Sequence, residues 1–328
     1  MVTCNKQHAS FRQTLNTYGA VKTPCFFMVS FDCKQWHVEP LENPSGKVWY
    51  VLEGKGYAPH PPASMRLPTS LKKLPMPFEA YATKIASIQE EIRKGNTYLL
   101  NFTCKTPLDT PLELEDLFHA SHAPFRCLFK DRFVCFSPER FVKITHNTIH
   151  TFPMKGTIDA ALPEAARLLL EDEKEKAEHV MVVDLLRNDL GRIASYVRVK
   201  QFRYLEKIRA GQKELFQTSS HITGVLAQDW PTKLGDTLAA LLPAGSISGT
   251  PKKKTVELIT ALEGYERGFF TGVFGVFDGQ NLDSAVMIRF VEKEKGGFVY
   301  KSGGGITLES CAQKEYAEMV DKIYVPLL

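Results

Sequence analysis

The sequence predicts an α+β fold built from antiparallel sheets and helices, not a doubly wound α/β fold. Short stretches rich in β-branched and aromatic residues come in adjacent runs, as in "FRCLFKDRFVCFSPERFVKIT". Helical segments are inserted between these runs and do not alternate with single strands. Apolar residues make up 44% and charged residues 24% of the 328 residues, which is an ordinary globular balance.

The overall composition and charge also disfavour several classes of function and location. No apolar run approaches the ~18 residues of a membrane span, and residues 1–13 lack the apolar core of a secretory signal. A net charge of +4 is mild, and no Lys/Arg block is interleaved with aromatic residues, so nucleic acid is not an expected partner. The seven cysteines are scattered without metal-ligand spacing, which is typical of buried thiols in a cytoplasmic protein.

The first 75 residues are predicted to form a short N-terminal β segment followed by a proline-rich crossing. Residues 24–52 contain the strand-like stretches "PCFFMVSFD" and "KVWYVLEG". Residues 54–77 carry six prolines, which excludes a regular helix there. Residues 76–328 would form the main domain, with the N-terminal segment packed on it.

The main domain is expected to begin with a helix. Tyr81, Ile85, Ile88 and Ile92 recur at helical spacing, and Gly95 follows at the C-terminal end. The stretch "TYLLNFT" then has the composition of a strand.

A long helix is predicted over about 163–191, and it places carboxylates on an apolar face. Glu178 heads the stripe that continues through Met181, Val182 and Leu185, and Glu175 lies one turn earlier. A buried carboxylate must be paired, protonated or bound to a metal. The alternative is that Glu178 stays hydrated at the helix start, where it complements the helix dipole.

The last helix, near the C-terminus, offers a second pair of carboxylates. Ser310 with Gln313 fits a capping box, and Glu315 and Glu318 share one face. Two such pairs could meet around a divalent cation, for which oxygen ligands favour Mg²⁺ over zinc. The alternative is an exposed face with a Glu318–Lys322 ion pair.

The segment "PAGSISGTPKKKTVELITALEG" predicts a helix that breaks a local rule. Thr250 can cap it, and Gly264 can end it. Lys252, Lys253 and Lys254 then fill the first turn, where the helix dipole disfavours cations. Lysines in that place, Lys252 first, would strengthen an anion-binding site.

Other positions allow two interpretations each. Arg289, within "AVMIRF", either faces solvent or binds a carboxylate. The glycines of "KSGGGITLES" either let the backbone approach an anion or form a flexible turn. Lys155 stands alone in "TFPMKGTID", a turn with no acidic residue directly beside it.

As a set, these segments resemble the chorismate-utilising enzymes, which include anthranilate, aminodeoxychorismate, isochorismate and salicylate synthases. The resemblance is closest to the aminodeoxychorismate synthase component I branch. It covers about three quarters of the chain, from residue 78 to the end, in the order of the family. The matching segments are "YATKIASIQEEIRKGNTYLLNFT", "SPERF", "PMKGT", "AEHVMVVDLLRNDLGRIA", "PAGSISGTPKKKTVELI", "MIRF" and "SGGGITLESCAQKEYAEMVDK".

The resemblance implies two large antiparallel sheets packed together with flanking helices, and a chorismate-binding catalytic domain over residues 76–328. It implies Mg²⁺ held by Glu178 and Glu318, with Glu175 and Glu315 close by, as the site for the ring carboxylate of chorismate. The remaining implied contacts are Arg289 with Gly303, Gly304 and Gly305 for the pyruvyl carboxylate, and Gly156, Thr157 and Thr250 along the ring.

The resemblance also implies a reaction. In the aminodeoxychorismate branch, the lysine at the position of Lys155 adds to C2 of chorismate, and ammonia then enters at C4 as the lysine leaves. Glu139, in "SPERF", matches the residue that protonates the departing hydroxyl group. A free lysine has a pKa of about 10.4, and lowering it by three units costs about 4 kcal/mol. The absence of an acidic neighbour in the sequence around Lys155 is therefore part of the expectation.

The implied product is 4-amino-4-deoxychorismate, on the route to p-aminobenzoate and folate, with ammonia from a separate glutamine amidotransferase subunit (component II). Two departures from the family pattern bear on this. Gln217 stands where the family often has a histidine, and Phe270 stands near a tyrosine of anthranilate synthases. The alternatives are an anthranilate or isochorismate synthase and, from another class, a non-catalytic chorismate-binding regulatory subunit.

Overall fold

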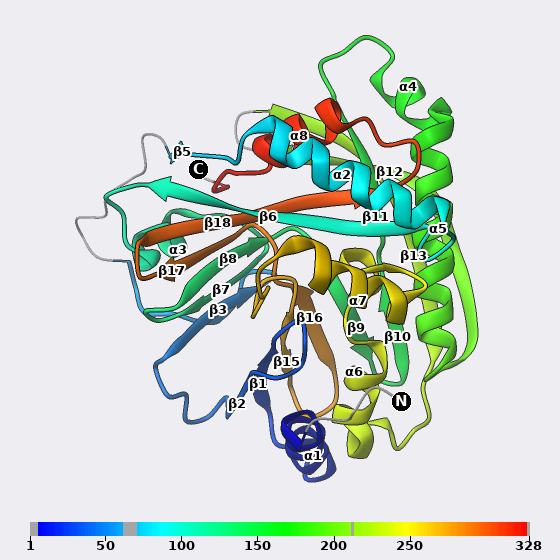
Figure 1. Cartoon of the computed structure of the whole chain (residues 1–328). Helices are drawn as coiled ribbons and strands as arrows, with labels where there is room; N and C mark the ends of the chain where they lie inside the picture. Colours follow the sequence, from blue (N-terminus) through cyan, green and yellow to red (C-terminus); the bar gives the residue numbers. More distant parts are fainter. Residues whose placement is uncertain (1–5, 62–70, 211–212, 327–328) are drawn as a thin grey trace.

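The computed structural model describes residues 6–61, 71–210 and 213–326, and it places two large sheets against each other (Figure 1). In this part of the chain each sheet has nine strands, and every recorded strand pairing is antiparallel. The expected α+β architecture with two antiparallel sheets is therefore confirmed.

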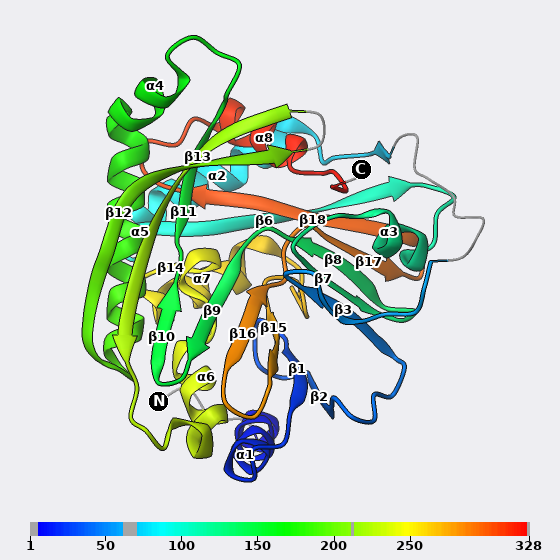
Figure 2. The same ribbon diagram turned by 180° about the vertical axis from the view of Figure 1, so that it is seen from behind.

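Sheet A runs in the order β11-β13-β10-β9-β16-β15-β1-β2, and β12 pairs with β13. Its strands are β1 Cys25–Val29, β2 Trp36–Pro40, β9 Arg140–Thr145, β10 Thr148–Thr151, β11 Met154–Asp159, β12 Ser195–Ala210, β13 Lys213–Val225, β15 Val273–Phe277 and β16 Leu282–Val286. Figure 2 shows the long strands β12 and β13 side by side.

Sheet B runs in the order β14-β6-β18-β17-β8-β7-β3-β4, and β5 pairs with β6. Its strands are β3 Val48–Leu52, β4 Lys55–Tyr57, β5 Lys72–Lys73, β6 Leu99–Asp109, β7 Phe125–Phe129, β8 Phe133–Ser137, β14 Gly249–Thr250, β17 Phe290–Glu294 and β18 Gly297–Ile306.

Helices lie around the two sheets. They are α1 Lys6–Ala20, α2 Phe78–Arg93, α3 Leu114–Ala120, α4 Ala165–Glu171, α5 Glu173–Gly191, α6 Leu234–Leu241, α7 Lys252–Glu263 and α8 Ala312–Asp321, with short 3-10 turns at Trp230–Lys233 and Gly245–Ile247. Helices α2 and α8 run side by side (Figure 1), and Tyr81 and Tyr316 meet edge to face between them at 5.3 Å. None of the described helices combines the length and apolar character that crossing a bilayer requires.

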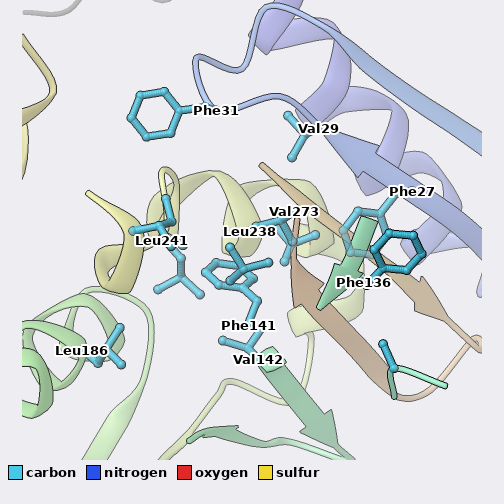
Figure 3. Packing of buried hydrophobic residues seen from close by; sticks show 14 of the residues in the cluster. Phe27, Val29, Phe31, Phe136, Phe141, Val142, Leu186, Leu238, Leu241 and Val273 are labelled. Carbon is cyan, nitrogen blue, oxygen red and sulfur yellow. The ribbon is translucent and has the colours of Figure 1, made fainter. Parts of the chain in front are cut away.

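The strand β1 shows why an unbroken apolar run forms a central strand. Alternate side chains of a strand point to opposite faces. Phe27 and Val29 join the main core, whereas Phe26 and Met28 join a second apolar cluster on the other face. Figure 3 shows Phe27 and Val29 in the main core together with Phe136 of β8. That core takes side chains from both sheets, so the sheets are packed on each other.

The N-terminal strands belong to both sheets. β1 pairs with β15 in sheet A, and β3 pairs with β7 in sheet B. The proline-rich crossing lies between β4 and β5, and its central residues 62–70 fall outside the described residues. The division of the chain near residue 75 stays a prediction.

The helix predicted over 78–95 is confirmed, and the one predicted over 163–191 is wrong in one respect. α2 buries Tyr81, Ile85 and Ile88, and Gly95 follows it with a positive φ of 74°. The second segment forms two helices, because Asp172 is extended and its side chain accepts a hydrogen bond from the Glu175 N–H. This N-cap starts a new helix.

Two predicted caps are also wrong. The residue before α7 is Pro251 and not Thr250, and it makes no side-chain cap. The residue before α8 is Cys311, because the Ser310 hydroxyl group instead donates to Glu315 at 2.8 Å. Both helices therefore begin without the predicted side-chain caps.

Candidate active site

A cavity of about 490 Å³ lies against β6, β11, β18, α5 and α8. Its lining brings together most of the residues that the sequence singled out, although they come from segments far apart in the chain. These are Glu139, Lys155, Gly156, Thr157, Glu175, Glu178, Arg289, Gly303, Gly304, Gly305, Glu315 and Glu318. Gln217 and Phe270, the two departures from the family pattern, line it as well.

Lys155 enters the cavity from an irregular part of β11. The pairing of β11 with β13 shifts between Lys155 and Thr157, and Gly156 has a φ of +78°. A side chain at Gly156 would be strained by this φ, and its Cβ would lie 3.0 Å from Oε2 of Glu175. A glycine at this bulge therefore lets α5 approach the strand closely.

The expectation that Lys155 lacks an acidic neighbour is wrong in the folded structure, although no acidic residue is adjacent to it in the sequence. Its ammonium group forms an ion pair with the Glu178 carboxylate of α5. Burial disfavours the charged lysine, but the Glu178 charge, helped by Glu175 and Glu318, outweighs burial and raises the pKa of Lys155. Sequence neighbours could not reveal this pair, because a bulged strand and a helix bring the two residues together.

The carboxylates of α5 and α8 face one another across the cavity and share lysines. Lys174 Nζ lies 3.7 Å from Glu178 Oε1 and 3.9 Å from Glu315 Oε1. Lys322 Nζ lies 2.6 Å from Glu318 Oε1. Glu178 is buried, so the interpretation that it stays hydrated at the helix start is wrong.

Crowding of like charges shifts the pKa values of these carboxyl groups. Burial, together with the nearby Glu318 and Glu178 charges, raises the pKa of Glu315. Burial and the Glu178 charge likewise raise the pKa of Glu175. Such a cluster of carboxylates attracts cations, because an added positive charge would relieve the repulsion.

The chemistry of this donor set fits Mg²⁺, which prefers carboxylate oxygens. Across residues 6–61, 71–210 and 213–326, however, no three acidic, histidine or cysteine side chains are already arranged to hold a metal ion. The carboxylates point instead at Lys155, Lys174 and Lys322. A cation would therefore replace lysine contacts with its own.

Glu139 lies between β8 and β9 at another part of the cavity. Burial raises the pKa of its carboxyl group, which the hydrogen bond from Ser246 and the charges of Arg289 and Lys322 oppose only in part. Ser246 donates to Oε1 of Glu139 from the 3-10 turn Gly245–Ile247. A carboxyl group with a raised pKa can stay protonated and act as an acid.

Arg289 and the glycine run form a site suited to an anion. Arg289 has a positive φ of 52°, and its buried Nε has no hydrogen-bond partner among the described residues. Its guanidinium group lies 5.3 Å from the centre of the Tyr324 ring. An added Cβ at Gly303 would lie 2.0 Å from the Phe102 carbonyl oxygen, so only glycine allows the close pairing of β18 with β6 there.

Two predicted site residues do not line the cavity. Thr250 pairs with Leu99 in sheet B, and its carbonyl oxygen accepts from Tyr98 N at 2.8 Å. Lys252 donates to Asp189 Oδ2 at 2.6 Å and to the Leu241 carbonyl oxygen at 3.0 Å. Lys252 thus neutralises the buried Asp189 carboxylate near the end of α5, and it is not placed to bind an anion in the cavity.

Sequence reasoning missed several residues of the site. Lys174 was recognisable as the residue four positions before Glu178, at ion-pair spacing. Ser246 lies in the quoted "PAGSISG" segment but had no partner visible nearby, because Glu139 is 107 residues away. Asn101, Thr103 and Lys301 also line the cavity, and no local pattern marks them.

Comparison with known proteins adds three findings. A family described as chorismate binding enzyme matches residues 10–327. The chain is 45% identical over 328 residues to an "Uncharacterized PabA-like protein" of Haemophilus influenzae, which covers 100% of this chain and 99% of the relative. It is also 33% identical over 273 residues to aminodeoxychorismate synthase component 1 of Klebsiella aerogenes, covering 78% of this chain and 58% of that relative.

A solved structure supports the same architecture. Anthranilate synthase component I from Streptococcus pneumoniae superposes with a TM-score of 0.68 and 28% identity. The superposition covers 81% of this chain and 62% of that one. The same arrangement of strands and helices thus occurs in a solved protein.

Proposed function

This chain belongs to the chorismate-binding enzyme family, and on that premise we propose that it aminates chorismate to 4-amino-4-deoxychorismate. The observation that carries the proposal is that Lys155 and Glu139 line the same cavity. A lysine at this place is what the resemblance implies for the aminodeoxychorismate branch.

Lys155 would act as the nucleophile. Its amine forms a bond to C2 of chorismate, the ring double bonds shift, and the C4–O bond breaks. Glu139 gives its proton to the departing hydroxyl group, which leaves as water. Ammonia then forms a bond to C4, the double bonds shift back, and the Lys155–C2 bond breaks. The sum is chorismate plus ammonia giving 4-amino-4-deoxychorismate plus water.

Lys155 must be a neutral amine to attack, although its ion pair with Glu178 favours the ammonium form. Mg²⁺ held by Glu178 and Glu318, with Glu175 and Glu315 beside them, would neutralise these carboxylates and bind the ring carboxylate of chorismate. With the Glu178 charge neutralised, burial, which disfavours the charged form of Lys155, would favour the neutral amine. The same carboxylate cluster would thus control both the substrate and the nucleophile.

Arg289 and the backbone of Gly303–Gly305 would hold the pyruvyl carboxylate. Arg289 is half-buried and its buried Nε is unpartnered, so a carboxylate would satisfy it. Lys322 lies close by, because its Nζ donates to the Gly303 carbonyl oxygen at 3.0 Å. Binding at this end would orient C2 toward Lys155 and C4 toward the entering ammonia.

Ammonia would come from a glutamine amidotransferase subunit, and the product would serve p-aminobenzoate and folate synthesis. The test is product analysis by mass spectrometry after incubation with chorismate, Mg²⁺ and an ammonium salt. We expect 4-amino-4-deoxychorismate. Anthranilate or isochorismate as the sole product would refute the assignment, and turnover no faster than that of Glu178→Gln would indicate a non-catalytic binding subunit.

A further inference from the structure

A buried arginine behind the cavity has every donor occupied. Arg267 Nε donates to Glu263 Oε2 at 2.8 Å, and Nη2 donates to Glu263 Oε1 at 2.6 Å and to the Asn101 carbonyl oxygen at 2.7 Å. Nη1 donates to the Ile247 carbonyl oxygen at 2.9 Å and to Thr271 Oγ1 at 3.2 Å. These contacts use all five N–H groups of the guanidinium.

Several hydrogen-bond partners of the Arg267–Glu263 ion pair line the cavity. Asn101, Ile247 and Thr271 accept directly from Arg267 and come from three separate segments. Thr103 donates to Glu263 Oε1 through both its N–H, at 2.8 Å, and its hydroxyl group, at 2.7 Å. One buried ion pair thus holds a large part of the cavity wall from behind.

The link to the reacting groups runs through the turn Gly245–Ile247. Arg267 holds the Ile247 carbonyl oxygen, and the preceding residue, Ser246, donates its hydroxyl hydrogen to Glu139. The chain of contacts therefore runs from a fixed guanidinium through a short turn to the carboxyl group assigned as the acid.

We propose that Arg267 is a positioning residue for catalysis: with Glu263 it fixes the turn Gly245–Ile247, so that Ser246 holds the Glu139 carboxyl group in place. The inference rests on the proposed function, since it takes Glu139 as the acid. Lysine could not replace Arg267, because an ammonium group has three donors and no planar fork for Glu263. Nothing in the arrangement requires Arg267 to touch the substrate.

The test is a double-mutant cycle of Arg267→Lys and Ser246→Ala, read as the rate of chorismate consumption whatever the product. Arg267→Lys should lower kcat by about 10²-fold, since small misplacement of a catalytic group has effects of that size. The KM for chorismate should change little. Ser246→Ala should lower kcat by about 10-fold, part of the contribution of an acid catalyst.

The double variant decides the matter. If Arg267 acts through Ser246, the double variant should match Arg267→Lys within about 3-fold, because residues of one network are not additive. Losses that multiply would overturn the proposal, and so would a normal kcat in folded Arg267→Lys. If Arg267→Lys does not fold, Glu263→Gln takes its place in the same cycle.

Arg126→Lys is the matched control. Arg126 donates to the Ser121 carbonyl oxygen away from the cavity, so this variant should keep the native kcat.

The pH profile supplies a readout that loss of stability does not move. Glu139 must be protonated to act, so kcat falls as pH rises through its pKa. The Ser246 hydrogen bond lowers that pKa, as do the positive charges of Arg289 and Lys322. Ser246→Ala should therefore move the alkaline limb to higher pH, and Arg267→Lys should move it in the same direction. If the alkaline limb of the kcat–pH profile stays at the native pH in both variants, the proposal is contradicted. If the enzyme forms a different product but the two substitutions are still non-additive, the proposed function is refuted and the role of Arg267 stands.

Discussion

Two ion pairs flank the cavity, and they differ in how completely their charges are satisfied. Arg267 and Glu263 have side chains only 2% and 1% exposed, and all the guanidinium donors are bonded. The Lys155 side chain is 27% exposed, and its Glu178 partner also has Lys174 3.7 Å away. The Arg267–Glu263 pair therefore has no donor free for a new partner. In the Lys155–Glu178 pair, by contrast, a second lysine competes for the carboxylate.

The difference separates groups that position from groups that react. A fully bonded buried pair is costly to break, because removal of either partner leaves an unpaired charge. A crowded pair with a shifted pKa can exchange partners when a ligand arrives, and such groups are typical of functional sites. We therefore expect changes at Lys155 to affect chemistry and changes at Arg267 to affect geometry.

The largest effect is expected from removing the nucleophile. Lys155→Ala should lower the formation of 4-amino-4-deoxychorismate by about 10³-fold or more, the size seen when a covalent catalyst is lost. The measurement is product quantification by mass spectrometry. Lys176→Ala is the control, because Lys176 is an exposed lysine of α5 that pairs with Glu173. Unchanged product from Lys155→Ala would exclude covalent catalysis.

Removal of divalent cations should have the next largest effect. A chelator should lower turnover by about 10²-fold, and Mg²⁺ should restore it, because in the proposed mechanism a cation bound by the four glutamates frees Lys155 from its ion pair with Glu178. Glu318→Gln should raise the Mg²⁺ concentration needed for half-maximal rate. Mg²⁺ titration by calorimetry checks the same site without turnover. Equal binding by Glu318→Gln and the native protein would place the metal elsewhere.

A loss of similar size is expected at the acid. Glu139→Gln keeps an oxygen that can accept from Ser246 but cannot give a proton, so kcat should fall by about 10²-fold. The native kcat should fall as pH rises through the pKa of Glu139, which burial raises above that of an ordinary glutamate. A pH profile of Glu139→Gln should lack this limb. Identical profiles for the two proteins would assign the proton to another group.

The smallest effect on turnover is expected where the structure corrects the sequence. Lys252→Met should leave the KM for chorismate within about 2-fold, because Lys252 pairs with Asp189 and not with the cavity. The same change should lower the free energy of unfolding by about 3 kcal/mol, since Asp189 is left buried without its partner. Denaturant unfolding and steady-state kinetics measure the two effects. A large rise in KM would restore Lys252 as a substrate contact.

The sequence predicted the parts of the site that local pattern or resemblance marks. Helical spacing put Glu178 on the buried face of its helix, and the segments "SPERF" and "PMKGT" identified Glu139 and Lys155. The pairing of Lys155 with Glu178 was missed because it depends on how β11 is set against α5. Arg267 was missed for the same reason, since its contact to Asn101 spans 166 residues.

Fold prediction failed mainly at element boundaries, but it also missed the helix α1, Lys6–Ala20, within the N-terminal segment predicted as β structure. The strands and the helix α2 follow from period and composition, which are local. The break between α4 and α5 follows from the extended backbone of Asp172, whose side chain accepts from the Glu175 N–H. Arg203, which is distant in the sequence, donates to the last carbonyl oxygens of α4, and an otherwise helical stretch conceals both features. Ser310 was assigned to a cap because Gln313 follows it at capping-box spacing, whereas its hydroxyl group donates to Glu315.

The central claim is that Lys155 bonds to C2 of chorismate before ammonia enters. Intact-protein mass spectrometry after acid quenching, with Mg²⁺ and chorismate but no ammonia, tests it most directly. We predict a protein heavier by chorismate less one water, with the added mass mapped to the peptide that contains Lys155 and absent from Lys155→Ala. An unmodified native protein that nevertheless forms 4-amino-4-deoxychorismate once ammonium is added would contradict the account.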